Sequence, residues 1–182
     1  MHFEHVLKLL LIGFENQRIR YGAIGGFAIG SLGVPRATAD LDFLVHHEDL
    51  EKVHGILGQL GYERIRHTEN VSHYAHTLTL WGSIDVLHAF RVPSLAMLQR
   101  TQSYPIFTTH TIRVLQPEDI IGLKVQAMAN DALRRAKETA DIEALLTRYG
   151  KKVDWKRLKE YYELFELGGE FQTLQERFSH AE

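Results

Sequence analysis

The sequence contains no cysteine, which excludes disulfide bonds, thiolate zinc sites and a cysteine nucleophile. It also lacks a long hydrophobic run, and the apolar stretch at residues 9–12 is far too short to span a bilayer. The first residues lack the basic segment and small-residue cleavage site of a signal peptide. We therefore expect a cytoplasmic protein that has no membrane partner.

The charge balance has little excess of either sign, because the net charge is −2 over 182 residues. A general polyanion binder would need a strong positive excess, so this class is excluded. Hydrophobic residues make up 45% of the chain and charged residues 24%, as in ordinary globular proteins. The length suits one domain, or one domain with a small helical extension.

The hydrophobic pattern changes character along the chain. Helical spacing or length predicts helices at 3–16, 27–32 and 48–60, and apolar alternation predicts strands at 20–24, 41–45, 62–66, 74–80, 83–89 and 112–115. Trp81-Gly82 is interpreted as a hairpin turn between the strands on either side of it. From Pro117 onward the pattern is helical, with breaks near 130–131, 150 and 168–169.

These elements predict an α+β (mixed α/β) fold. A mixed central sheet flanked by helices would occupy residues 1–116, and a C-terminal helical region would occupy residues 117–182. The sequence leaves open whether the helical region packs on this core or lies beside it.

Two carboxylates stand out in the segment 40–45. Asp40 and Asp42 are two residues apart, so a strand would place both on one face. Leu41 and residues 43–45 are apolar, which predicts a central strand where an acidic pair requires a compensating charge. Mg²⁺ (or Mn²⁺) would supply that charge, since Mg²⁺ prefers oxygen ligands and binds through one or two carboxylates.

A third carboxylate, Asp85, lies inside the apolar strand predicted at 83–89. If that strand neighbours the first, Asp85 would lie beside the pair Asp40 and Asp42 as a metal ligand or a general base. An ordinary satisfied strand acid is the competing interpretation of each residue taken alone. The combination of all three with the glycines described next favours metal binding and catalysis.

Gly25 and Gly26 follow a predicted strand and precede a predicted helix. Glycine lets the backbone approach a phosphate closely, and the N–H groups at a helix start favour anions. The pair belongs to neither a Walker loop nor a dinucleotide fingerprint, because the required residues are missing. An ordinary turn is the alternative.

The pattern Gly25-Gly26, a spacer, Asp40-Leu41-Asp42 and a later Asp85 resembles the DNA polymerase β-like nucleotidyltransferase superfamily. The stretch 36–42 (Arg-Ala-Thr-Ala-Asp-Leu-Asp) and the helical segments 124–127 and 137–142 are similar to the AbiEii-type toxin branch. The resemblance covers about residues 20–145.

This resemblance implies a function. Asp40, Asp42 and Asp85 would hold Mg²⁺ and catalyse transfer of a nucleoside monophosphate from an NTP, such as ATP, to an acceptor. Gly25 and Gly26 would form the phosphate turn. Further nucleotide or phosphate contacts are assigned to Arg36, Thr38 and Lys124, and possible secondary roles to Lys137 and Asp141.

The acceptor is left open by the resemblance. A toxin would modify tRNA and be held by an antitoxin protein, whereas an antibiotic-modifying enzyme would use a small molecule, and a protein acceptor is the third alternative. A non-catalytic nucleotide-binding or assembly module on the same fold is the competing class.

None of the eleven histidines is assigned to a metal site. His73 and His76, for example, lack the spacing by which two residues of one strand or helix chelate an ion.

Overall fold

The computed structural model describes residues 3–107 and 110–179 and divides the chain into two compact units, residues 1–115 and 116–182. The first unit is mixed α/β and the second is helical, which confirms the predicted fold class. Whether the two units behave as separate domains stays a prediction. Among the described residues, no helix has the length and apolar character needed to cross a membrane.

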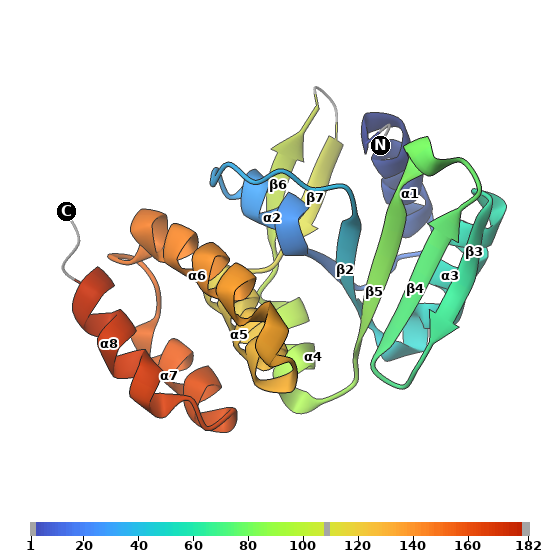
Figure 1. The fold of residues 1–182 in the computed structure, drawn as a ribbon. Coiled ribbons are helices and arrows are strands. Elements are labelled where there is room, and N and C mark those ends of the chain that lie inside the picture. The colour runs from blue at the N-terminus through green and yellow to red at the C-terminus, as the bar shows by residue number, and fades with distance from the viewer. Residues whose placement is uncertain (1–2, 108–109, 180–182) are drawn as a thin grey trace. The chain divides into compact units, whose positions relative to one another are not determined.

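One mixed sheet organises the first unit (Figure 1). The strands run in the order β3-β4-β5-β2-β1-β7-β6. Strand β2 pairs in parallel with β5 and antiparallel with β1, so the acid-bearing strand is central, as predicted. The strand bounds are β1 (Tyr21–Ile24), β2 (Leu41–His46), β3 (Tyr62–His67), β4 (Val71–His76), β5 (Ser83–Ala89), β6 (Gln102–Ile106) and β7 (His110–Val114).

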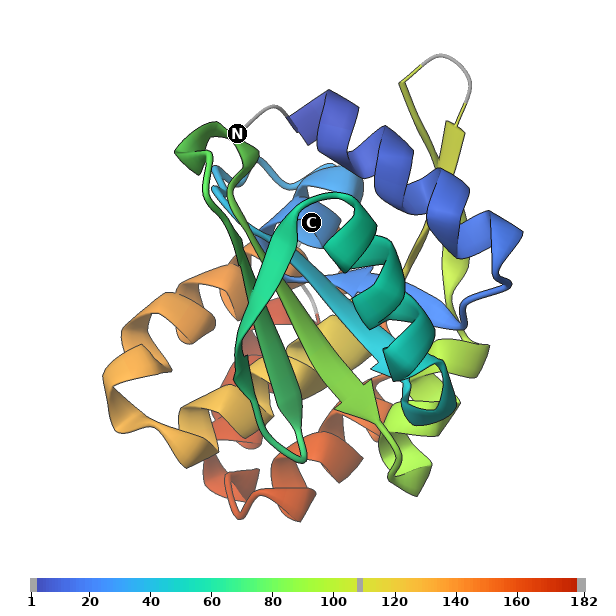
Figure 2. The ribbon, with the colours of Figure 1, turned by 90° about the vertical axis from the view of Figure 1, so that its right-hand side faces the viewer.

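Helices α1 and α3 lie side by side in the first unit (Figure 2). The apolar stripe of α1 is buried, and Phe14 packs against Phe43 of β2 with ring centroids 5.4 Å apart. Helix α2 packs on β1 and β2, and α4 packs on β2 and β5. The bounds are α1 (Phe3–Asn16), α2 (Gly25–Ser31), α3 (Leu50–Gln59) and α4 (Val92–Gln99), with short 3₁₀ turns η1 (His47–Asp49) and η2 (Thr79–Trp81).

Alternation along the central strands separates a buried face from a partly open one. Phe43, Ile84 and Val86 are at most 1% exposed and form the buried face. Their strand neighbours Asp42 and Asp85 are only partly buried and point to the other face. The acidic residues therefore lie on the side of the sheet opposite the α1 packing.

The prediction of a strand over residues 74–80 was wrong in its bounds. Strand β4 ends at His76, and η2 follows it. Gly82 has φ +69°, a left-handed conformation that ends η2, and the hydroxyl of Tyr62 donates to the carbonyl of Trp81 at 2.7 Å. The segment between the two strands is thus a helical turn anchored by a side chain, rather than a two-residue hairpin.

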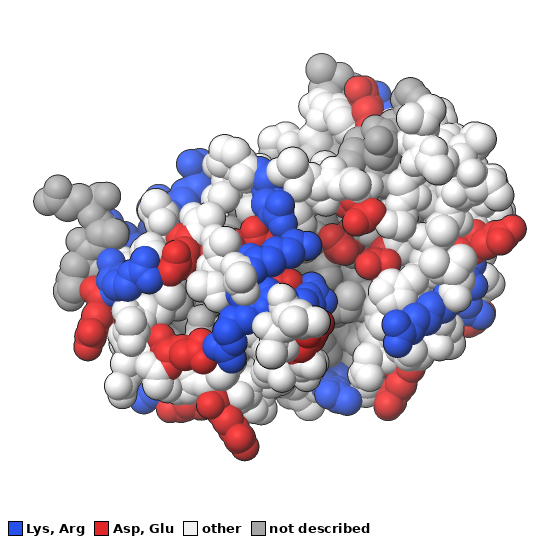
Figure 3. Space-filling view, viewed as in Figure 1, with Lys and Arg blue, Asp and Glu red and all other residues white. Residues whose placement is uncertain are grey.

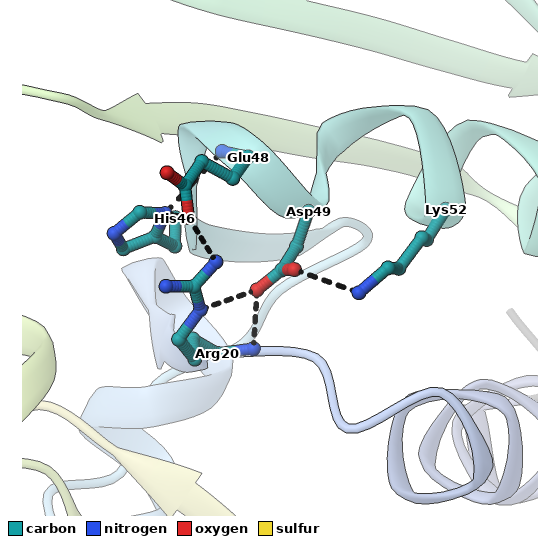
Figure 4. A network of polar contacts seen from close by, with 5 residues as sticks. All are labelled: Arg20, His46, Glu48, Asp49 and Lys52. Carbon is teal, nitrogen blue, oxygen red and sulfur yellow. Dashed lines mark hydrogen bonds and ion pairs between the residues drawn. The ribbon is translucent and has the colours of Figure 1, made fainter.

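A network of polar side chains joins the start of β1 to η1 (Figure 4). The carboxylate of Asp49 is 2% exposed and accepts hydrogen bonds from the backbone N–H and the Nε of Arg20 and from Lys52. Burial alone would raise the pKa of Asp49, but these hydrogen bonds outweigh burial and hold the pKa well below its usual value. The network fixes the chain where it leaves β2.

The second unit is a helical bundle in which α5 contacts α6 and α7, and α7 contacts α8. The hydroxyl of Tyr161 donates to buried Asp119 at 2.7 Å, which ties α7 to α5. Breaks fall near 130–131 and at 150 as predicted, whereas α8 begins at Gly168 and the break precedes it. The bounds are α5 (Pro117–Asn130), η3 (Ala132–Arg134), α6 (Arg135–Tyr149), α7 (Trp155–Leu164) and α8 (Gly168–Phe178).

Candidate functional site

Asp42 and Asp85 face each other across neighbouring strands. They are direct partners in the parallel β2–β5 pairing, so their side chains lie on the same face of the sheet. Acidic side chains gather over β2 and β5 in the space-filling view (Figure 3). The structure therefore brings together two of the three predicted acids. Carboxylates on directly paired residues of neighbouring strands can share a cation.

Asp40 lies outside the strand on which it was expected. It occupies an exposed bend directly before β2, which begins at Leu41. The hydroxyl of Ser83, the first residue of β5, donates to Oδ1 of Asp40. The expectation that Asp40 and Asp42 share a strand face is corrected, but Ser83 holds Asp40 at the same end of the β2–β5 pair.

Gly25 leaves room for the carboxylate of Asp42. Its φ is +66°, a left-handed conformation that favours glycine, and an added Cβ would lie 1.9 Å from Oδ2 of Asp42. Asp42 is the β-sheet partner of Ile24, the residue before this glycine. A side chain at position 25 would displace the carboxylate of Asp42, so glycine is required there. Sequence patterns alone do not show this requirement.

The predicted phosphate residues Gly26, Arg36 and Thr38 lie together. A Cβ on Gly26 would meet the Cβ of Thr38 at 2.8 Å and the Cγ of Arg36 at 3.5 Å. The Thr38 hydroxyl donates to the carbonyl of Asp40 at 3.1 Å, which links this loop to the acidic end of β2. Gly25 and Gly26 are the first two residues of α2, not a turn before it.

Lys124 lies in the second unit and has carboxylate partners there. Its Nζ is 2.7 Å from Glu138 and 2.6 Å from Asp141, and the residue is 8% exposed. Burial would raise the pKa of Glu138, but hydrogen bonds from Lys124 and Arg134 lower it overall. This arrangement favours a structural role for Lys124 and Asp141, so their assigned nucleotide roles stay predictions.

Lys137 is exposed on α6. Asp141, four residues further along the helix, pairs with Lys124. A second pair at the same spacing, Arg134 with Glu138, is present at 2.6 Å.

Sequence analysis missed one residue of this region, His73. It is the partner of Asp85 in the antiparallel β4–β5 pairing, and its Nδ1 is 2.7 Å from Oδ1 of Asp85. His73, Asp85 and Asp42 therefore form one row across three strands, called the polar row below. The contact joins residues twelve positions apart, and only the strand register reveals it.

The polar row suits a metal ion that takes only part of its ligands from the protein. Within the described residues, no three or more His, Cys, Asp or Glu side chains converge as a ready-made metal site. Mg²⁺ does not require such a cage, because it binds through one or two carboxylates and takes its other ligands from water and substrate phosphates. The adjacent, partly exposed carboxylates of Asp42 and Asp85 suit that mode of binding.

Solved structures share this fold at low sequence identity. The antibiotic-resistance factor ANT(2'')-Ia, solved in solution, matches with a TM-score of 0.68 and 13% identity, covering 97% of this chain and 96% of that chain. The lincosamide antibiotic adenylyltransferase LnuA matches with a TM-score of 0.54 and 16% identity, covering 78% of this chain and 95% of that chain. A putative nucleotidyltransferase from Thermotoga maritima matches with a TM-score of 0.52 and 13% identity, covering 81% of this chain and 94% of that chain.

The likeness establishes the nucleotidyltransferase fold. Among curated proteins, none matches the sequence. A protein family does match, over residues 4–170, which is most of the chain. On that match, with the fold in agreement, the chain belongs to the family described as "Uncharacterised nucleotidyltransferase".

Proposed function

We propose that this protein transfers a nucleoside monophosphate from an NTP to an acceptor hydroxyl in a Mg²⁺-dependent reaction. The observation that carries the proposal is the direct pairing of Asp42 with Asp85 on two central strands. Gly25 lies beside them, and its lack of a side chain leaves room for the carboxylate of Asp42. The family description agrees with this class of reaction.

Each residue of the site has a proposed role. Asp42 and Asp85 would hold the metal, with Asp40 as a third acid oriented by Ser83. When bound, Mg²⁺ neutralises charge on the triphosphate. Gly26 would meet the phosphates through its backbone N–H, and Thr38 would do so once its hydroxyl hydrogen turns away from the carbonyl of Asp40.

The reaction conserves atoms and charge as follows. The acceptor oxygen forms a bond to the α-phosphorus while the bond from that phosphorus to pyrophosphate breaks. The proton of the acceptor hydroxyl passes to water as the new bond forms, so Asp85 stays ionised and can keep its contact with the metal. Positioning of the two reactants and electrostatic stabilisation supply most of the rate enhancement in this chemistry.

A small molecule with several hydroxyl groups is the first candidate acceptor. ANT(2'')-Ia, which shares the fold over almost the whole of both chains, is also known in complex with adenylyl-2''-tobramycin. The second candidate is tRNA, modified by a toxin that an antitoxin restrains. This second role rests on the sequence resemblance of residues 36–42 to the AbiEii-type branch.

The experiment supplies Mg²⁺, each α-³²P-labelled NTP in turn, and either an aminoglycoside mixture or total RNA. Wild-type protein is compared with Asp42→Asn and with Glu63→Gln, an acid-to-amide change on exposed β3. We expect label on one acceptor class with wild type and Glu63→Gln, and none with Asp42→Asn or after chelation of the metal.

A wild-type turnover by Asp42→Asn would refute the mechanism. If no acceptor is labelled, the thermal unfolding of wild type with Mg²⁺ and NTP decides on the non-catalytic alternative. A bound ligand at about 100 times its dissociation constant adds about 2.7 kcal/mol to the stability. A rise in the unfolding temperature without transfer would therefore indicate a nucleotide-binding module. An unchanged unfolding temperature would exclude both the catalytic and the nucleotide-binding interpretation.

A further inference from the structure

The polar row contains a residue that the proposed chemistry does not yet use. His73 pairs with Asp85 across β4 and β5, and both side chains are 31% exposed. We propose that His73 is a positioning residue that orients the Asp85 carboxylate for nucleotidyl transfer. The inference rests on the proposed function and adds a third strand, β4, to the two strands that carry Asp42 and Asp85.

The direction of the hydrogen bond follows from the chemistry of the two groups. An ionised carboxylate only accepts hydrogen bonds, so the proton between the two residues belongs to Nδ1 of His73. The short contact, 2.7 Å between Nδ1 and Oδ1, is typical of a charge-assisted hydrogen bond. Asp85 thereby fixes which ring nitrogen of His73 carries the proton, and His73 occupies one of the two oxygens of Asp85.

The neighbouring carboxylate explains why such a restraint matters. Asp42 lies on the other side of Asp85, on a strand about 4.8 Å away. Two anions at this spacing repel, and an Asp85 side chain without a further partner would sample several orientations. Because His73 binds Oδ1 from the β4 side, the carboxylate is held in one orientation, with Oδ1 toward β4 and Oδ2 available to the reaction.

The other histidines of this part of the sheet have different partners. His67 and His88 both contact the hydroxyl of Ser72, at 2.8 and 2.9 Å, and Ser72 is 2% exposed. Ser72 and His88 are even-numbered residues of β4 and β5, and His67 is the partner of Ser72 in the β3–β4 pairing, so these contacts lie on the face opposite the polar row. The contact between His73 and Asp85 is thus separate from the contacts of Ser72 with His67 and His88 on the opposite face of the sheet.

The first test compares His73→Leu with His73→Asn. The amide nitrogen of Asn, like Nδ1 of His, is bonded to Cγ, so Asn retains a donor toward Asp85 whereas Leu does not. We expect His73→Leu to lower kcat by about 10- to 100-fold with little change in the KM for NTP. His73→Asn should recover most of kcat. The control is His76→Leu, the same change on the same strand at a residue whose ring stacks on Trp81.

The second test needs no turnover. Nitrogen-15 NMR of the histidine rings in the wild-type protein should show a proton on Nδ1 of His73, and the Asp85→Asn variant should alter that ring signal. A His73 ring with a bare Nδ1, or full kcat in His73→Leu, would overturn the positioning role while leaving nucleotidyl transfer intact. A wild-type protein without any transfer overturns the proposed function and this role together, even if NMR shows the hydrogen bond.

Discussion

Gly25 and Asp42 are in contact at a place where no side chain fits. A Cβ on Gly25 would lie 1.9 Å from Oδ2 of Asp42, and φ at this position is +66°. The first residue of α2 and the central acid of β2 therefore depend on each other.

Replacement of Gly25 by alanine should damage both the fold and the site. The positive φ and the displaced carboxylate together should cost about 1–3 kcal/mol of unfolding free energy. Transfer activity should fall further than stability, because Asp42 must move. Gly30→Ala is the matched control in the same helix, since nothing lies within 4 Å of its added Cβ. Urea unfolding measures the stability, and the transfer assay measures the activity. Equal stability and equal activity of the Gly25→Ala and Gly30→Ala variants would contradict the prediction.

Replacement of Lys124 by methionine should mainly affect stability. The change leaves Glu138 and Asp141, which are 2% and 7% exposed, without their buried cation. Breaking such a buried ion cluster costs about 3–5 kcal/mol. Exposed Lys137→Met on α6 should stay within about 0.5 kcal/mol of wild type. A Lys124→Met protein of normal stability but with a raised KM for NTP would instead support the phosphate role.

Replacement of Asp49 by asparagine should weaken the connection between β1 and η1. The amide keeps the size of the side chain but presents N–H groups to Arg20 and Lys52, which are themselves donors. We expect a loss of about 2–3 kcal/mol in urea unfolding. Glu48→Gln is the control, because Glu48 binds the same arginine at the surface and such pairs contribute about 0–1 kcal/mol. Similar losses in both variants would show that burial of Asp49 is unimportant.

Acidification should destabilise the protein through His88. Burial lowers the pKa of His88, and the hydrogen bond to the carbonyl of Glu69 only partly offsets this effect. Between the lowered folded-state pKa and the unfolded value of about 6.5, the unfolded chain binds more protons, so stability falls as the pH drops below about 6.5.

The measurement is the unfolding free energy at several pH values for wild type and His88→Gln. The variant should lose part of the pH dependence in that window. His46, whose pKa is lowered by burial and by Arg20, acts in the same direction and should leave a residual slope. An unchanged pH dependence in His88→Gln would show that this histidine does not link protonation to folding.

Local sequence patterns predicted much of the fold. The apolar stripe of α1, the acid-bearing strand β2 and the proline-initiated helix α5 all appear at or near their expected bounds. Helix α4 and strand β6 were not predicted, because α4 has no strong apolar stripe and the exposed strand β6 has few buried residues. The strand ascribed to residues 74–80 failed at η2, where a tertiary hydrogen bond to Tyr62 competes with strand extension.

The candidate site was predictable only in part. The spacing of Asp40 and Asp42 and the apolar setting of Asp85 indicated an acidic centre, and the register of β2 with β5 places two of these acids together. No sequence signal predicts the contact of His73 with Asp85, because it requires the pairing of β4 with β5 in one particular register. The buried setting of Lys124 likewise depends on how α6 packs on α5.

The polar row takes one residue from each of three strands, and this has a consequence for folding kinetics. Asp42 and Asp85 are far apart in the sequence, and pairing them requires closure of a long loop that includes β3 and β4. Non-local pairings of this kind form slowly. A nascent or partly refolded chain should therefore acquire its helices first and the polar row last, and a shift of one residue between β4 and β5 would turn His73 to the other face of the sheet.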